Sequence, residues 1–259
     1  MTSIRKISPA RWGVVIFYLL TILMNYISQA IPFNGQTNGE VSDKYATLIT
    51  PAGYAFSIWG VIFLALGAYA YFQAFVADSS TKIYDSIAPW LIVAFIATSA
   101  WLPVFQYEMI SFSVIFMLII LGSLIQISIM LTKDRTMSRR ENALVRIPFG
   151  LYLGWISVAT IVNISVLAKY TQWNLLGISE ANWLLIMITV GFVLAVLVSV
   201  ATGNLVYSLV FVWAFVAIAV KHFDENALMQ FSLGAAVILL IVGLGLLIRQ
   251  FKQRKVMLA

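Results

Sequence analysis

Trp155, Ala159 and Asn163 are the residues of this sequence whose types and spacing point most directly to binding chemistry. They recur at every fourth position, so on a helix they share one face. The stretch around them, 147–168, holds about 20 residues without a charge, which is long enough to cross a bilayer core of roughly 30 Å. An amide has no partner in hydrocarbon, so Asn163 should face protein or a cavity. We expect this face, with its large ring, small gap and amide, to form one wall of a ligand pocket.

Other aromatic and hydrogen-bonding residues are expected at a similar depth. Trp59 lies well inside its apolar stretch, and Thr98 lies one helical turn before Trp101. Asn25 and Gln29 share a face near the end of the first stretch. A mainly apolar pocket with a few placed polar groups is typical of small-molecule sites, but the amides could instead hydrogen-bond one helix to another. Trp101, considered alone, is more typical of an aromatic residue at the membrane interface.

Ionisable residues are missing from the centres of the apolar stretches. Such residues usually mark proton relays and ion pathways, so we do not expect a proton-coupled pump or an ion channel. The single histidine, His222, lies in the polar stretch KHFDEN and is predicted to be a solvated loop residue. No nucleophile elbow, phosphate-binding loop or dinucleotide fingerprint is present in the sequence. The sequence thus predicts no catalytic residue and no metal ligand, and we expect a protein that is not an enzyme.

The composition places these residues in a membrane. The chain is 62% hydrophobic and 10% charged, whereas ordinary soluble domains are roughly 45–50% apolar and about 25% charged. We therefore predict an all-α, polytopic membrane helical bundle. The eight predicted spans are 12–31, 51–77, 87–105, 109–132, 147–168, 182–200, 204–220 and 228–248. The span at 204–220 is short and follows the preceding span after a tight turn, so a bundle of seven spans is the alternative.

The basic residues predict the orientation of the bundle. If the N-terminus is cytoplasmic, 13 of the 16 Lys and Arg residues fall in inside segments, and only Lys44, Lys169 and Lys221 fall outside. This asymmetry follows the positive-inside rule and predicts a multi-pass protein of the cell membrane with both termini in the cytoplasm. Basic residues in those segments would also meet anionic lipid headgroups. The net charge of +6 therefore does not indicate a nucleic-acid partner.

Four local features bear on how the spans are joined and packed. The long connection 32–50 is rich in Gly, Asn and Thr, and could be a lid over a binding site or a solvated connector. Pro148 suits the first turn of a helix. Gly150 and Gly154 would let two helices approach closely, either within the bundle, which we favour, or in a homodimer. Trp213, deep in its span, is expected to serve packing.

One segment resembles the second helix of the tryptophan-rich sensory protein or translocator protein family (TspO/MBR). It reads PAGYAFSIWGVIFLALGAYAYFQ and covers 51–73. The family's helix carries Phe-x-x-Trp, an aromatic residue four positions on and a later Gly. Phe56, Trp59, Phe63 and Gly67 occupy those places.

Two further segments resemble the family in the same order along the chain. The sequence WLIVAFIATSAWLPVF at 90–105 is similar to the third helix, whose end has a Trp followed by Pro or Leu and Phe. The sequence PFGLYLGWISVATIVNISV at 148–166 resembles the fifth helix, with its spaced Trp, Ala and Asn. Together the resemblance covers about 12–170, which holds five consecutive spans.

The resemblance implies a five-helix bundle with a pocket beneath the loop that joins the first two helices. Family members bind porphyrins and other flat hydrophobic ligands, including sterols in animals, and indole faces stack well on flat conjugated molecules. No resident cofactor is implied, and a porphyrin or other tetrapyrrole would be the ligand. Resemblance and depth together give these candidate ligand-binding residues: Asn25, Trp59, Phe63, Thr98, Trp101, Trp155, Ala159 and Asn163.

The sequence also departs from the family pattern. The connection 32–50 contains no Trp, Thr98 stands where the third helix usually has Asn, and 182–248 has no counterpart in the family's five helices. We therefore divide the chain into a TspO-like membrane core at 1–175 and an additional three-helix membrane unit with a basic cytoplasmic tail at 176–259.

These features together predict an integral membrane protein that binds a hydrophobic, tetrapyrrole-like small molecule for sensing or transport. Its expected partners are the lipid bilayer and that ligand. One alternative is a small-molecule permease that uses all eight spans. A weaker one is an enzyme that breaks down a bound tetrapyrrole, and a structural membrane protein without a ligand is a fourth.

Overall fold

The computed structural model of the protein describes residues 7–78, 81–134 and 138–257. This part of the chain is all-helical, with nine α-helices and no strand. The long helices are α1 (Pro9–Ala30), α3 (Ile58–Tyr71), α4 (Lys82–Gln106), α5 (Ile110–Lys133), α6 (Arg139–Tyr170), α7 (Glu180–Thr202), α8 (Val206–Lys221) and α9 (Asn226–Met257). The short helix α2 (Asn38–Lys44) lies in the connection between α1 and α3. Shorter turns of 3-10 helix occur at Gly53–Ser57 and Leu175–Gly177, and a π-helical turn at Phe72–Val76.

Seven helical segments of the described chain are long and apolar enough to cross a membrane. In one of them, Gly53–Val76, α3 is extended by the 3-10 turn before it and the π-helical turn after it. The remaining apolar helix, α8, has 16 residues, and at 1.5 Å per residue it rises only about 24 Å. Each of the eight predicted spans therefore corresponds to one helix, but only seven reach the full length. Of the basic residues behind the predicted orientation, Arg5, Lys6 and Arg135 lie outside the described residues.

Local sequence explains where several helices begin. At α1, the Ser8 side chain accepts a hydrogen bond from the Arg11 amide, and Pro9 takes the first position, where a missing N–H costs nothing. At α6, Ser138 and Glu141 form a reciprocal capping box. This cap starts α6 well before the apolar run, so Pro148 lies inside the helix and the prediction that it occupies the first turn was wrong.

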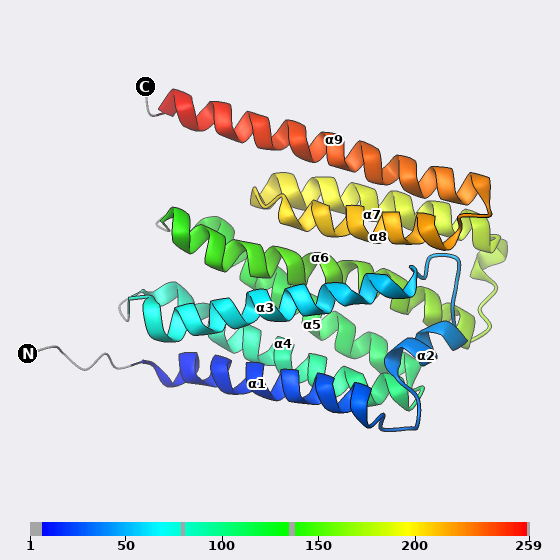
Figure 1. Ribbon diagram of the computed structural model, residues 1–259, viewed down its shortest axis with the longest axis horizontal. Coiled ribbons are helices and arrows are strands. Elements are labelled where there is room, and N and C mark those ends of the chain that lie inside the picture. Colours follow the sequence, from blue (N-terminus) through cyan, green and yellow to red (C-terminus); the bar gives the residue numbers. More distant parts are fainter. Residues whose placement is uncertain (1–6, 79–80, 135–137, 258–259) are drawn as a thin grey trace, which may run out of the picture.

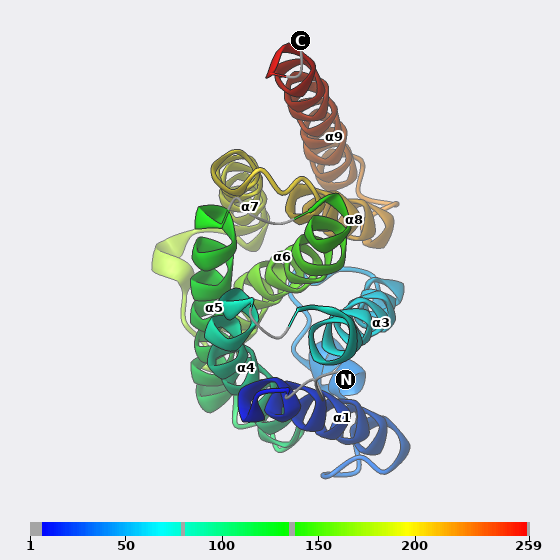
Figure 2. The same cartoon turned by 90° about the vertical axis from the view of Figure 1, so that its left-hand side faces the viewer.

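The helices run side by side along the molecule (Figure 1). In the perpendicular view, α1, α3, α4, α5 and α6 form one group, while α7, α8 and α9 lie together on its far side (Figure 2). α8 joins the two groups because it packs against α6 as well as α9. A Cβ added to Gly154 of α6 would lie 2.9 Å from Val210 of α8, and one added to Gly150 would lie 2.5 Å from Asn204. The two glycines therefore serve packing within the bundle, as favoured from the sequence.

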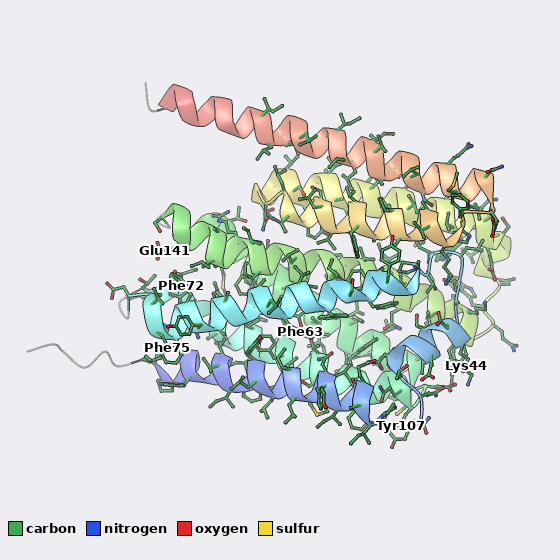
Figure 3. The ribbon with its side chains drawn as sticks, viewed as in Figure 1. Lys44, Phe63, Phe72, Phe75, Tyr107 and Glu141 are labelled. Carbon is green, nitrogen blue, oxygen red and sulfur yellow. The ribbon has the colours of Figure 1, made fainter. Side chains whose placement is uncertain are left out.

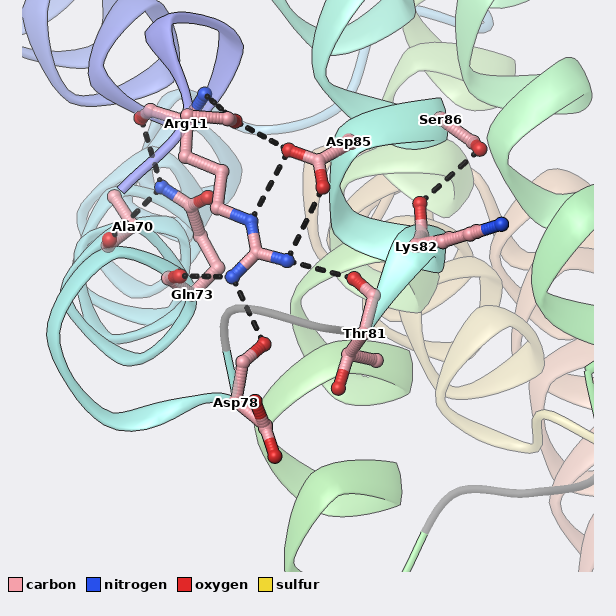
Figure 4. Close-up of polar contacts among 9 residues, drawn as sticks. Arg11, Ala70, Gln73, Asp78, Thr81, Lys82, Asp85 and Ser86 are labelled. Atoms are coloured by element: carbon pink, nitrogen blue, oxygen red, sulfur yellow. Dashed lines mark hydrogen bonds and ion pairs between the residues drawn. The ribbon is translucent and has the colours of Figure 1, made fainter. Parts of the chain in front are cut away.

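A buried arginine fixes the end of the bundle at which α1 begins. Arg11 is 2% exposed and pairs with Asp85 of α4, with Nε 3.2 Å from Oδ1. Its terminal nitrogens donate to backbone carbonyls in the link between α3 and α4, including Thr81 O at 2.6 Å and Asp78 O at 3.1 Å (Figure 4). In return, Gln73 Nε2 donates to the Arg11 carbonyl at 3.0 Å. One guanidinium thus holds α1, α4 and the segment between α3 and α4 together. We call this region the Arg11 end.

Candidate ligand-binding cavity

A cavity of about 580 Å³ lies among α1, α3, α4 and α6, toward the end of the bundle covered by α2. Its volume falls within the roughly 300–1,000 Å³ of typical small-molecule pockets. Its wall is mostly apolar and aromatic. The residues that line it are Ile22, Asn25, Tyr26, Gln29, Asn38, Gly39, Ser42, Asp43, Pro51, Gly53, Phe56, Trp59, Gly60, Phe63, Thr98, Trp101, Leu102, Phe105, Met117, Trp155, Val158, Ala159, Val162, Asn163 and Val166.

All eight candidate residues border this one cavity, although they come from four helices. α1 supplies Asn25, α3 supplies Trp59 and Phe63, α4 supplies Thr98 and Trp101, and α6 supplies Trp155, Ala159 and Asn163. Phe63 lies midway along α3, while Lys44 lies at the end of the bundle where α2 covers the cavity (Figure 3). The structure thus brings the candidates together. That they bind a ligand stays a prediction.

Two aromatic pairs form the sides of the cavity. Trp59 and Phe63, one turn apart on α3, stack with ring centroids 5.2 Å apart. On α4, Trp101 and Phe105 stack in the same way at 4.7 Å. Trp101 therefore packs against a ring of its own helix and borders the cavity, whereas its depth relative to a membrane interface stays a prediction. Its spacing from Phe105 places both rings on the inner face of α4.

Trp155 closes the cavity on the α6 side. It is 2% exposed, and Phe56 meets it edge-on, with centroids 5.8 Å apart and an interplanar angle of 89°. Ala159, one turn further along α6, borders the cavity without a ring. The predicted combination of a large ring beside a small gap is therefore present in the wall.

Asn163 borders the cavity and also joins three helices. Its Oδ1 accepts from Trp101 Nε1 at 3.1 Å and from Ser113 Oγ of α5 at 3.2 Å, and its Nδ2 lies 3.0 Å from the same hydroxyl. Both interpretations of the amide thus apply, because it lines the pocket and links helices. Because Asn163 already accepts a hydrogen bond from the indole N–H of Trp101, a ligand would contact this tryptophan chiefly through its ring face.

Thr98 has a partner that the sequence did not reveal. Its hydroxyl hydrogen-bonds to the hydroxyl of Tyr152 on α6 and lies 2.8 Å from the carbonyl of Ala94. Tyr152 is 1% exposed, and its ring meets Trp59 at 6.0 Å between centroids. Its spacing on α6 is typical of ordinary core packing, so no sequence signal marked it as a support of the cavity.

The connection 32–50 covers the cavity rather than extending into solvent. Helix α2 contributes Asn38, Gly39, Ser42 and Asp43 to the cavity wall. The segment before α2 is fixed by Gln106 at the end of α4, whose Oε1 accepts from the Phe33 amide at 2.8 Å. We call residues 32–50 the lid.

Glu108, in the turn between α4 and α5, fastens the other side of the lid. Its carboxylate accepts from Gln36 Nε2 at 2.7 Å, from Lys44 Nζ at 2.6 Å and from the Tyr45 hydroxyl. Hydrogen bonds from Gln36, Lys44 and Tyr45 lower the pKa of Glu108 to about 2. Glu108 has a φ of 57°, a left-handed conformation that is uncommon for residues other than glycine. Sequence reasoning missed this contact because the residues that meet lie more than 60 positions apart.

The last residues of the lid and the segment that follows it rest on α8 and on the residue that caps its C-terminus. His222, which is 5% exposed, lies with Nε2 2.7 Å from the Leu48 carbonyl and Nδ1 3.2 Å from Glu225. Trp213 Nε1 donates to the Ala55 carbonyl at 3.0 Å. The prediction of a solvated His222 was wrong, because its backbone partner comes from a distant part of the chain. Trp213 does more than pack, because its indole N–H also holds the backbone between Gly53 and Phe56, which both line the cavity.

Within the described residues, no group of three or more His, Asp or Glu side chains is placed to hold a metal ion. Of the described residues in the cavity wall, only Asp43 has an ionisable side chain, apart from the phenol of Tyr26. The cavity can therefore surround a flat, mostly apolar molecule with aromatic rings on several sides and with polar groups at the lid.

Comparison with known proteins agrees with this architecture. The family model described as TSPO-like protein matches residues 11–246. The match extends beyond the five spans in which the motif resemblance was found, since it also covers α7, α8 and most of α9. No curated protein and no solved structure matches the chain. The chain is an integral membrane protein that belongs to the TSPO-like protein family.

Proposed function

We propose that this protein binds a flat, hydrophobic small molecule with a tetrapyrrole-like ring system in the cavity beneath the lid, for sensing or transport. The observation that carries the proposal is the convergence of Trp59, Trp101 and Trp155 from three helices on one covered space of about 580 Å³. Indole and phenyl faces stack on flat conjugated rings. Burying apolar ligand surface in a mostly apolar cavity favours binding.

The experiment that tests the proposal is a titration of the purified protein, in nanodiscs, with an uncharged porphyrin ester, while tryptophan fluorescence is followed. Ala159→Leu fills the space beside Trp155. It is expected to weaken binding by at least about tenfold, because overlap between a bulky side chain and a ligand commonly costs more than 1.4 kcal/mol. The matched control is Ala68→Leu, the same change at an exposed position on α3, which should leave the affinity unchanged.

The possible outcomes separate the site from the function. Saturable binding that Ala159→Leu leaves intact would place the ligand elsewhere in the protein. If neither the porphyrin ester nor other flat aromatic compounds bind saturably, the proposed function is wrong. If a compound does bind saturably, its flux into proteoliposomes separates transport from sensing.

We also propose that the protein lies in the cell membrane with the Arg11 end and both termini in the cytoplasm, which places the lid outside. The proposal rests on the asymmetry of the basic residues in the sequence. The chain has no cysteine, so single cysteines can report on each side. An impermeant maleimide added to intact cells should label Asp224→Cys, near the lid, and should not label Lys133→Cys. The reverse pattern would invert the orientation.

A further inference from the structure

We infer that the cavity selects a ligand whose polar end is uncharged or positively charged, and that it disfavours one ending in carboxylates. The inference rests on the proposed function and names the class of ligand for the same cavity. The observation that carries it is that Asp43, on the lid helix α2, is the one charged side chain among the described residues that line the aromatic cavity.

The charge in the cavity wall has one sign. None of the described residues that line it is Lys, Arg or His, and the one carboxylate among them belongs to Asp43. A ligand carboxylate placed beneath the lid would lose much of its hydration, would meet no cation there and would be repelled by Asp43. An ammonium group in the same place would instead be attracted to Asp43.

The cations nearest the lid are engaged elsewhere. Lys44 directs Nζ to Glu108, at 2.6 and 2.8 Å from its two carboxylate oxygens. Lys169 donates to the carbonyl of Ala46 at 2.5 Å. Neither lysine lines the cavity. His222 faces Leu48 and Glu225, so it does not neutralise a ligand carboxylate either.

The lid also presents an acceptor that lacks a donor. Asn38 Oδ1 is buried and accepts no hydrogen bond from any described residue, although Asn38 borders the cavity. This oxygen is buried from the cavity as well as from solvent, so a ligand reaches it only if the Asn38 side chain turns. Ser42, one turn along α2 from Asn38, adds a hydroxyl to the same wall. Amide and hydroxyl groups can pair with an amine or with a carboxylate, so the preference comes from the charge of Asp43, which attracts a protonated amine and repels a carboxylate.

The test compares three porphyrins with the same ring: the dicarboxylic acid, its dimethyl ester, and a derivative in which each carboxyl is converted to an amide that ends in a primary amine. Binding is measured by tryptophan fluorescence with the full chain in nanodiscs of zwitterionic lipid, so that lipid charge does not bias the comparison. The ester is expected to bind at least about tenfold more tightly than the diacid, and the amine at least as tightly as the ester.

Asp43→Asn assigns the preference to one side chain. This variant should lower the affinity for the amine about three- to fivefold and leave that for the ester within about twofold, because only the amine interacts with the charge and Asp43 is itself exposed. Asp224→Asn removes an exposed carboxylate that does not line the cavity and serves as the matched control, with no change for either ligand.

The outcomes distinguish this inference from the proposed function. Diacid binding as tight as that of the ester would overturn the charge preference while the proposed function stands. An amine affinity that Asp43→Asn leaves unchanged would overturn the role of Asp43. If none of the three porphyrins binds, the proposed function fails, and the inference fails with it.

Discussion

The two ends of the helix group formed by α1, α3, α4 and α6 are built in opposite ways. At the Arg11 end, side chains fill the space between helices. Tyr18 of α1 lies against Gly67 of α3, where an added Cβ would come within 2.5 Å of its hydroxyl, and that hydroxyl donates to the Phe63 carbonyl at 2.9 Å. At the lid end, Gly60 of the same helix borders the cavity and an added Cβ would meet nothing within 4 Å.

This difference shows how a helical bundle can keep a cavity and remain folded. A cavity destabilises because its lining loses contacts that a filled core would make. At the Arg11 end, the ion pair of Arg11 with Asp85 holds α1 against α4, and the contact of Tyr18 with Gly67 holds α1 against α3. The lid end can then keep its cavity. The same helices thus stabilise the bundle at one end and line the cavity at the other.

The strongest way to break this division is to remove the arginine. Arg11→Met removes the cationic partner of Asp85 and the guanidinium that donates to the carbonyls of Gln73, Asp78 and Thr81. Because Asp85 is 37% exposed, we expect a loss near the lower limit for a buried pair, about 3 kcal/mol. Thermal unfolding in detergent measures the effect.

The control for this variant is a neighbouring cation. Lys82→Met removes a charge of the same sign at an exposed position of α4 and should change the stability by less than about 0.5 kcal/mol. Equal melting temperatures for the two variants would show that the Arg11 end does not stabilise the bundle in the way described.

The two glycines of α3 allow a sharper comparison of medium size. Gly67→Ala forces Tyr18 away from Phe63 and should destabilise the protein by about 1–2 kcal/mol. Gly60→Ala adds a methyl group to open space, and should be neutral or stabilise by up to about 1 kcal/mol, because alanine favours a helix more than glycine does. Unfolding of the two single variants under the same conditions measures the difference, and destabilisation by Gly60→Ala would contradict the open geometry at the lid end.

The smallest effect at neutral pH is expected from the contact that fastens the lid. Because hydrogen bonds lower the pKa of Glu108 from 4.5 to about 2, its contribution to lid stability is fully present above pH 4.5 and is lost as the pH falls toward 2. The protection of the α2 amides against hydrogen exchange, corrected for the pH dependence of the intrinsic exchange rate, should therefore fall across that window. Glu108→Gln should show less of this change, with the remainder arising from Glu40 in the cap of α2, whose pKa hydrogen bonds from Thr37 also lower. Glu180→Gln, which removes an exposed carboxylate at the start of α7, should retain the full change. An identical pH profile in wild type and Glu108→Gln would remove Glu108 from the lid contact.

Sequence reasoning recovered the apolar helices and the residues around the cavity because both depend on local spacing. Trp155, Ala159 and Asn163 share a face by helical geometry alone. Contacts between distant segments could not be read in this way. Arg11 and Asp85 are 74 positions apart, and His222 and Leu48 are 174 apart. Their types and neighbours are those of ordinary charged termini and polar loops, so the sequence alone indicated solvent exposure for His222 and gave no partner for Arg11.

The short length of α8 has a consequence for the lipid around the protein. A helix of 16 residues facing lipid on all sides would require the bilayer to thin locally. Most of α8 is instead enclosed by α6, α7 and α9, and the backbone at 48–55 crosses its last turns, where Ala52 N donates to Ala217 O at 3.1 Å. Irregular backbone at membrane depth needs such internal partners. The short helix α8 thus supports the backbone at 48–55 beside the cavity, and lengthening α8 by one turn would displace that backbone.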